Sequence, residues 1–178
     1  MKYVALLRGI NVGGHSLIKM ADIQAAVERS GFRNVHTVLQ SGNIVFETYE
    51  KNEGKIEAAL EETAKHAFDL NTLIIVKSAK QIKRVIAGVP ADWEKRDDIR
   101  RYIAFVKAPL LVRDVIKELK PKEGIDFFTS GENVVYLSTL FSGRTKSGLS
   151  KIMTNPVYKK ISLRNYNTVK KIAVLMGK

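Results

Sequence analysis

The sequence predicts an α+β protein built from two duplicated ferredoxin-like halves. Each half is a βαββαβ unit plus one extra helix, with a mostly antiparallel sheet. Three observations predict this fold. Strand and helix periodicities follow one another in the same order in both halves of the chain. Each half has a hairpin with a Ser-Gly pair in its turn, at Ser41-Gly42 and at Ser130-Gly131. Each half then closes with a helix that ends at a glycine, Gly88 or Gly177.

The first half covers residues 1–90. Apolar residues at helical spacing predict its first two helices, and Ser78 is the expected N-cap of the third. Continuous or alternating apolar runs predict its strands. In order, we expect a strand over 2–8, a helix over 20–30, hairpin strands over 34–40 and 44–48, a helix over 53–68, a strand over 72–77 and a helix over 78–88.

The second half covers residues 100–178 and follows a charged linker over 91–99. Pro121 stops its first helix, Asn155-Pro156 forms an N-cap and first helical residue, and Thr168 is the expected cap of the last helix. In order, we expect a strand over 101–107, a helix over 112–119, a hairpin over 126–138, a helix over 149–153, a short strand near Ser162 and a helix over 168–177.

Several strands are apolar on both faces, such as VALL at residues 4–7 and LIIV at residues 73–76. A ferredoxin-like sheet standing alone covers one face with its helices and leaves the other in water. We therefore expect the second face to be covered too, by the extra helices or by the sister half.

The composition favours a cytoplasmic protein with an anionic partner. The 178 residues are 45% hydrophobic, and no apolar run suits a membrane span or a signal peptide, so no membrane partner is expected. The absence of cysteine excludes disulfides, thiol nucleophiles and zinc-thiolate sites.

The net charge is +12. Residues 133–178 carry nine Lys/Arg and no acid, whereas residues 1–132 carry 21 Lys/Arg and all 18 acids. This field favours nucleic acid or a phosphate-bearing small molecule; the alternative is a solvated basic surface without a specific partner.

The stretch LLRGINVGGHS at residues 6–16 is one residue away from a phosphate-binding P-loop, but we interpret it otherwise. His15 stands where a P-loop has lysine, and the next helix starts near Met20 rather than directly after Ser16. P-loops also belong to parallel sheets, and this sheet is expected to be antiparallel. A long glycine-rich loop between a strand and a helix is nevertheless typical of a ligand site.

Four groups of polar residues are candidate ligand contacts. They are Arg8, Asn11, Gly13, Gly14, His15 and Lys19 in the glycine-rich loop, Ser41 and Asn43 in the hairpin turn, Arg144 and Lys146 in the basic loop 141–148, and Arg164, Asn165 and Asn167 before the last helix. Three groups have structural alternatives. The glycine-rich loop would pack over the other half, the last segment would tie the halves together, and the turn would need Gly and Asn for positive φ. For the turn, the structural interpretation is favoured.

Four aromatic residues lie among the basic residues of the second half: Tyr136, Phe141, Tyr158 and Tyr166. Stacking of single-stranded bases would need this interleaving, although core packing is the favoured interpretation. The hairpin sequences GNIVFETY and GENVVYLS do not match the signature of RNA-recognition motifs, which excludes that assignment.

Catalysis has weaker support than binding. The three histidines, His15, His36 and His66, have no metal-ligand spacing, and we expect no metal and no cofactor. Ser41 and His15 lack a third group that would orient them for nucleophilic catalysis. Two alternatives stay open: an enzyme acting on a small phosphorylated substrate with His15 as acid/base, and a protein-interaction module.

Three stretches of the chain resemble a bacterial family known as domain of unknown function 1697. They are LLRGINVGG (6–14), KMADIQAAVERSGFRNVHTVLQSGNIVF (19–46) and SLRNYNTVKKIAVL (162–175). The family often has Trp where this chain has Tyr166, which keeps an aromatic ring there. The resemblance implies a compact α+β fold of duplicated ferredoxin-like halves. It implies no established activity, so no catalytic residues are carried over from it.

Overall fold

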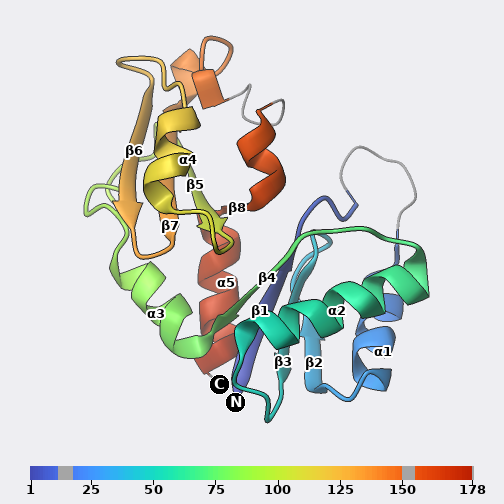
Figure 1. Ribbon diagram of the computed structural model, residues 1–178. Helices are drawn as coiled ribbons and strands as arrows, with labels where there is room; N and C mark the ends of the chain where they lie inside the picture. The colour runs from blue at the N-terminus through green and yellow to red at the C-terminus, as the bar shows by residue number, and fades with distance from the viewer. Residues whose placement is uncertain (12–17, 150–154, 178) are drawn as a thin grey trace. The chain divides into compact units, whose positions relative to one another are not determined.

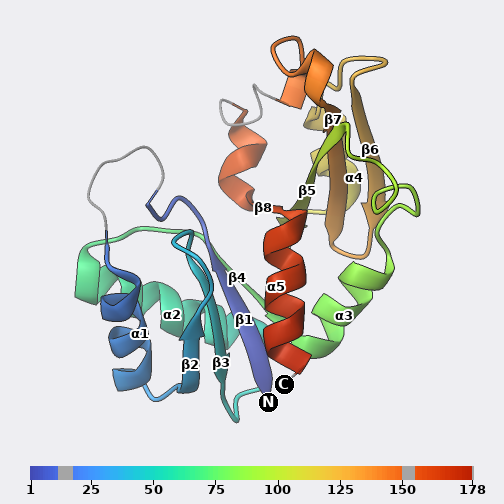
Figure 2. The ribbon, with the colours of Figure 1, turned by 180° about the vertical axis from the view of Figure 1, so that it is seen from behind.

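The computed structural model describes residues 1–11, 18–149 and 155–177, and the chain divides into two compact units. Unit 1 comprises Met1–Lys83 and Lys170–Lys178, and unit 2 comprises Arg84–Val169. The division falls inside two helices, α3 (Ala79–Ala87) and α5 (Tyr166–Gly177). Each unit contains a four-stranded antiparallel sheet, which confirms the predicted α+β class (Figure 1 and Figure 2).

Unit 1 is a βαββαβ unit whose sheet has the strand order β2-β3-β1-β4. Its elements are β1 (Lys2–Leu7), α1 (Met20–Arg29), β2 (Arg33–Thr37), β3 (Asn43–Glu47), α2 (Glu53–Phe68) and β4 (Ile74–Ser78). The two helices pack on one face of the sheet, where Ile23 of α1 and Leu60 of α2 meet Ala5, Phe46 and Val76 in one buried cluster (Figure 1). The amphipathic spacing seen in the sequence therefore does build the core of unit 1.

Local chemistry fixes the ends of these elements. Asn52 is the N-cap of α2, and its side-chain oxygen accepts a 3.1 Å hydrogen bond from the Lys55 amide. Gly42, just before β3, has a φ of +67°, and a Cβ added to it would lie 3.0 Å from the carbonyl oxygen of Leu7. The turn therefore requires glycine for both its conformation and its close approach to β1.

Unit 2 repeats the strand order of unit 1 as β6-β7-β5-β8. Its elements are the end of α3, β5 (Ile99–Val106), α4 (Val112–Glu118), β6 (Asp126–Gly131), β7 (Val134–Leu140), the 3₁₀ turns η1 (Phe141–Gly143) and η3 (Pro156–Lys160), β8 (Ile161–Asn165) and the start of α5. The strands of unit 2 therefore occupy the same places in their sheet, in the same chain order, as those of unit 1. A duplicated ferredoxin-like unit requires this correspondence.

Helix α4 covers one face of the unit 2 sheet. Val115 of α4 packs there with Ala104 of β5 and Leu137 of β7. Because side chains alternate between faces along a strand, Arg100 and Tyr102 belong to this same face as Ala104. The α4 face of unit 2 therefore starts apolar under the helix and becomes basic toward the beginning of β5.

The opposite face of the unit 2 sheet is also covered. The Tyr136 hydroxyl donates a 2.8 Å hydrogen bond to the carbonyl oxygen of Val85 in α3. The Trp93 ring meets the rings of Tyr136 and Tyr166 edge-on, at centroid distances of 5.9 and 5.2 Å. Trp93 is 2% exposed, so the charged segment around it is anchored to unit 2 by a buried ring.

Two local predictions were wrong, and one falls outside the described residues. The second hairpin turns at Glu132-Asn133 rather than Ser130-Gly131; Asn133 takes the left-handed conformation, with a φ of +58°. Helix α5 begins at Tyr166, so Thr168 lies in its first turn. The oxygen of the Asn165 side chain accepts from the Asn167 amide at 2.9 Å in the position of a cap. Most of the helix expected over 149–153 lies in the range 150–154, outside the described residues.

Candidate functional site

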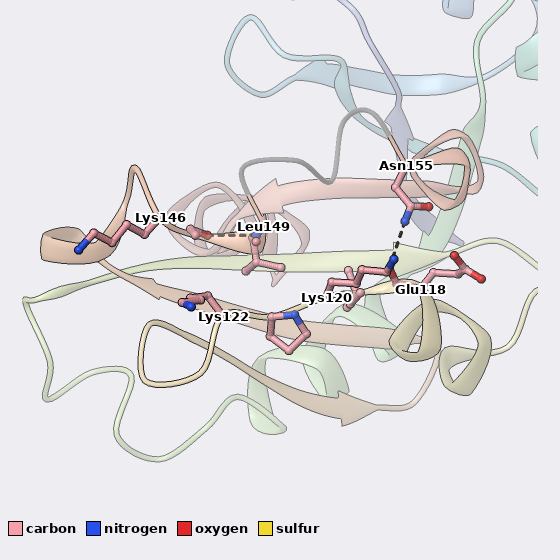
Figure 3. Close-up of a pocket in the computed structure, with 10 residues that line it drawn as sticks. Glu118, Lys120, Lys122, Lys146, Leu149 and Asn155 are labelled. Atoms are coloured by element: carbon pink, nitrogen blue, oxygen red, sulfur yellow. Dashed lines mark hydrogen bonds between the residues drawn. The ribbon is translucent and has the colours of Figure 1, made fainter.

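A pocket of about 420 Å³ lies in unit 2, beside the connection that follows α4 (Figure 3). We call it the basic pocket, because three lysines and one acid line it. Figure 3 shows Lys122 and Lys146 toward one end and Glu118 and Asn155 toward the other, with Leu149 between them. The lining residues are Glu118, Leu119, Lys120, Pro121, Lys122, Lys146, Ser147, Gly148, Leu149 and Asn155.

The lysines of the basic pocket are free to meet an anion from solution. Lys120, Lys122 and Lys146 are exposed, and none forms an ion pair with a carboxylate in the described part of the chain. Arg144, also exposed, lies two residues before Lys146. Like charges gathered at one opening attract anions over about 8–10 Å at physiological salt, and this attraction weakens as salt is added.

The carboxylate of Asp126 ties the two walls of the basic pocket together. One oxygen accepts from the hydroxyls of Ser147 at 2.6 Å and Thr139 at 2.8 Å. The other accepts from the backbone amides of Gly148 at 2.7 Å and Lys122 at 2.8 Å. The bonds from Lys122, Ser147 and Gly148 join the segment after α4 to the segment that carries Lys146, and the bond from Thr139 ties both to β7.

The same bonds hold the pKa of Asp126 below its usual value. Burial of the carboxyl group acts first and raises the pKa. The hydrogen bonds from Ser147, Lys122, Thr139 and Gly148 favour the charged form and together outweigh burial. Asp126 is therefore an ionised, fully engaged structural carboxylate at neutral pH, and it supplies no proton for chemistry.

Two glycines allow the segment after β7 to pack this closely. A Cβ on Gly148 would lie 1.9 Å from the carbonyl oxygen of Lys120, and one on Gly143 would lie 2.5 Å from a methyl carbon of Ile125. Both distances are well inside van der Waals contact. The glycines of the loop 141–148 therefore serve close packing, and the lysine and arginine between them carry the charge.

The candidate residues of the second half are split between different environments. Lys146 lines the basic pocket, with Arg144 beside it in sequence. Asn165 and Asn167 are exposed and line a second pocket, at the start of β5. Arg164 is 8% exposed and lines neither pocket; it donates a 2.9 Å bond to the Leu163 carbonyl, and burial lowers its pKa to about 10. It stays charged at neutral pH inside unit 2.

The described candidates of the first half all lie in unit 1, and two of them hold the ends of loops. The Asn11 side chain donates to the carbonyl oxygens of Ile18 at 2.9 Å and Gln40 at 3.1 Å, and it accepts from the Ile18 amide at 2.9 Å. Asn43 is fully buried and donates to the Val38 carbonyl at 2.9 Å. These bonds use both side-chain amides within the protein. Of the two turn residues expected to need positive φ, Gly42 has it and Asn43 does not.

The remaining candidates of unit 1 have less defined roles. Lys19 and Ser41 are exposed, and the Ser41 hydroxyl accepts a 3.1 Å bond from the Asn43 amide group. Arg8 is half-buried, and its backbone oxygen accepts from the Thr72 hydroxyl at 2.5 Å. Gly13, Gly14 and His15 lie outside the described residues, so the acid/base hypothesis for His15 stays a prediction.

Sequence reasoning missed the residues that complete the basic pocket. Lys120 and Lys122 flank Pro121, which was interpreted only as the end of a helix. Asp126 was not singled out, because an acid at the start of a strand has no distinctive pattern. The sequence does contain a signal for this site. Lys120 and Lys122 stand on either side of Pro121 in a short connection, and the strand that follows starts with Asp126.

The family model described as "Protein of unknown function (DUF1697)" matches residues 1–136. The chain belongs to this family. This family member is similar to a conserved bacterial protein from Streptococcus pneumoniae whose structure is solved, with 25% sequence identity and a TM-score of 0.86. The match covers 99% of this chain and 98% of that one, and it supports the arrangement in two halves. No curated protein matches the sequence.

Two further properties bear on the function of this family member. Among the described residues, no group of three or more His, Asp or Glu side chains is placed to hold a metal ion. In the same ranges, none of the helices has both the length and the apolar character needed to cross a bilayer.

Proposed function

We propose that unit 2 binds a partner carrying closely spaced phosphate groups, and that the basic pocket is its binding site. One observation carries the proposal: three exposed lysines line one pocket together with a single glutamate, and none of the three pairs with a carboxylate of the described residues. Lysine is a flexible point charge that suits phosphate oxygens without fixing one geometry. Binding by such a site depends on charge and falls steeply with salt.

The hydrogen bonds of Asp126 beside the pocket support the same proposal. Asp126 and its four donors fix the backbone on both sides, so the lysines start from defined positions and less entropy is lost on binding. The ligand chemistry has two sources, a nucleic acid strand or a phosphorylated small molecule. A contribution from the glycine-rich loop of residues 9–19, in unit 1, stays a prediction, as does the cytoplasmic location.

The test is a titration of the full chain with a fluorescent single-stranded oligonucleotide, and in parallel with a fluorescent nucleoside triphosphate, at about 50 and 200 mM salt. Three phosphate contacts on a single strand predict a loss of affinity of about 20-fold across this range. The triple variant Lys120→Gln, Lys122→Gln, Lys146→Gln should lose most of the binding and most of the salt dependence.

A matched variant separates the pocket from the overall charge. Lys51→Gln, Lys55→Gln and Lys65→Gln remove the same charge from exposed positions in unit 1. They should leave affinity within about 2-fold of the wild type, since none of the three lines the basic pocket. Equal weakening by both triple variants would show that only net charge matters. Failure of both ligands to bind at low salt would overturn the proposed function.

A further inference from the structure

A second pocket, of about 450 Å³, lies at the start of β5 in unit 2. We call it the arginine pocket, because Arg100 and Arg101 line it. The amides of Asn165 and Asn167 and the ring of Phe141 join them, with Asp97 as the acid of the pocket. Two guanidinium groups, two amides and an aromatic ring are a different chemistry from the three lysines of the basic pocket. They suit a ligand that carries planar polar groups as well as negative charge.

Phe141 gives the arginine pocket an exposed ring. Its side chain is 50% exposed, although phenylalanine is usually buried. Tyr136 and Tyr166 are each only 3% exposed, so the core interpretation holds for these two aromatic residues and fails for Phe141. The guanidinium carbon of Arg100 lies 5.7 Å from the centre of the Phe141 ring, within the range of a cation–π contact. The ring is thus held at the surface beside a positive charge.

The backbone around Phe141 is fixed as well. Its amide donates a 2.9 Å hydrogen bond to the carbonyl oxygen of Asp98, and it begins the 3₁₀ turn η1. Across the pocket, the Asn165 side-chain oxygen accepts from the Asn167 amide, which holds the start of α5. The ring and the asparagine amides therefore come from firmly placed backbone, as a preformed ligand site requires.

Strand register connects the arginine pocket to the basic pocket. Arg100 of β5 is directly opposite Thr139 of β7, and Thr139 is directly opposite Asp126 of β6. Residues directly opposite on paired strands share a face, so these three side chains form one row over about 10 Å, two strand spacings. The row begins at the arginine pocket and ends at the carboxylate that holds Lys122 and Gly148 in the basic pocket.

The chain segment 141–149 also joins the two pockets. Phe141 lines the arginine pocket, and Lys146, Ser147, Gly148 and Leu149 line the basic pocket. Arg144 lies between them in the sequence and is exposed. An extended ligand lying along this segment would contact the Phe141 ring at one end and the cations Arg144 and Lys146 further along.

We propose that unit 2 binds single-stranded nucleic acid along segment 141–149, with a base stacked on Phe141 in the arginine pocket and the backbone phosphates on the lysines of the basic pocket. This inference rests on the proposed function and names its ligand. A flat exposed ring beside arginine is a platform for an unpaired base, and the bases of a duplex are not available for such stacking. We expect the side-chain amides of Asn165 and Asn167, which line the same pocket, to hydrogen-bond the edge of the stacked base.

The experiment compares two strands that differ only in their bases. Fluorescence anisotropy would measure binding of the full chain to oligothymidylate of about 12 nucleotides, and to an abasic strand with the same number of phosphates. We expect the strand with bases to bind on the order of 10-fold tighter. Phe141→Ala should remove this preference and leave abasic binding unchanged, and Phe141→Trp should keep the preference.

Phe127 is a matched control for Phe141. It is 43% exposed, belongs to unit 2, and has the Arg96 guanidinium 5.8 Å from its ring centre. It is opposite Ser138, one position along from Thr139, so it belongs to the other face of the sheet. Phe127→Ala should therefore leave both affinities unchanged.

Three outcomes separate this inference from the proposed function. Equal affinity for the two strands overturns base stacking but leaves phosphate binding intact. A base preference that survives Phe141→Ala, or that Phe127→Ala abolishes, overturns the assignment to Phe141. Absence of binding to either strand overturns the inference. If the nucleoside triphosphate still binds, the proposed function survives with a phosphorylated small molecule as the ligand.

Discussion

The carboxylate of Asp126 accepts a 2.7 Å hydrogen bond from the backbone amide of Gly148, across 22 residues of sequence. This contact places the segment carrying Lys146 against the segment carrying Lys122, and so builds the basic pocket. The pocket thus depends on a buried acid that does not itself line it.

Asp126→Asn should destabilise unit 2 by about 2–3 kcal/mol, since an amide cannot accept all four hydrogen bonds and its NH₂ group would face donors. Urea unfolding followed by circular dichroism measures this. Glu123→Gln, at an exposed position in the same connection, is the control and should change stability by less than about 0.5 kcal/mol. Equal stability of the two variants would contradict the structural role of Asp126.

The contribution of Asp126 should also depend on pH. Its pKa is lower in the folded chain than in the unfolded one, so its stabilisation is complete above the unfolded pKa of about 4 and is lost as pH falls through the folded pKa. The difference in unfolding free energy between the wild type and Asp126→Asn should be constant from about pH 5 to 7 and shrink below about pH 4. A difference that stays constant down to about pH 2 would assign the stabilisation to packing rather than charge.

Gly148→Ala should be strongly destabilising, because the added carbon would meet the Lys120 carbonyl oxygen at 1.9 Å. We expect a loss of about 3 kcal/mol, at the upper end for overpacking. Gly177→Ala is the matched control: a Cβ there meets nothing within 4 Å, and alanine favours a helix, so the thermal midpoint should stay or rise slightly. A midpoint for Gly148→Ala equal to that of the wild type would contradict the close packing.

Asn11 offers a test of a structural role against a ligand role. Its φ of +54° disfavours alanine, and its side chain makes three hydrogen bonds to Ile18 and Gln40. Asn11→Ala should lose about 2–3 kcal/mol from strain and lost bonds, and Asn11→Gly should lose about 1 kcal/mol less because glycine accepts positive φ. Thermal unfolding of both variants measures this. Unchanged stability in both would favour a ligand role for Asn11.

The sequence predicted the order of elements well, because periodicity is a local property. Helix α2 was expected over 53–68, where the structure places it. The site was harder to predict. The segments that carry Lys122 and Lys146 are joined by the tertiary bonds of Asp126, and no local pattern reports such a contact. The burial of Arg164 was not predicted either, because it depends on its strand position opposite Ile103, which is fully buried.

The boundary inside α5 has a consequence for how the protein is made. Unit 1 begins with the first strand of the chain, yet it includes residues 170–178, which follow all of unit 2. A ribosome must therefore synthesise the whole of unit 2 before unit 1 can gain its last helical turns, where Ile172 is fully buried. Unit 2 is one continuous stretch of chain and can finish folding first.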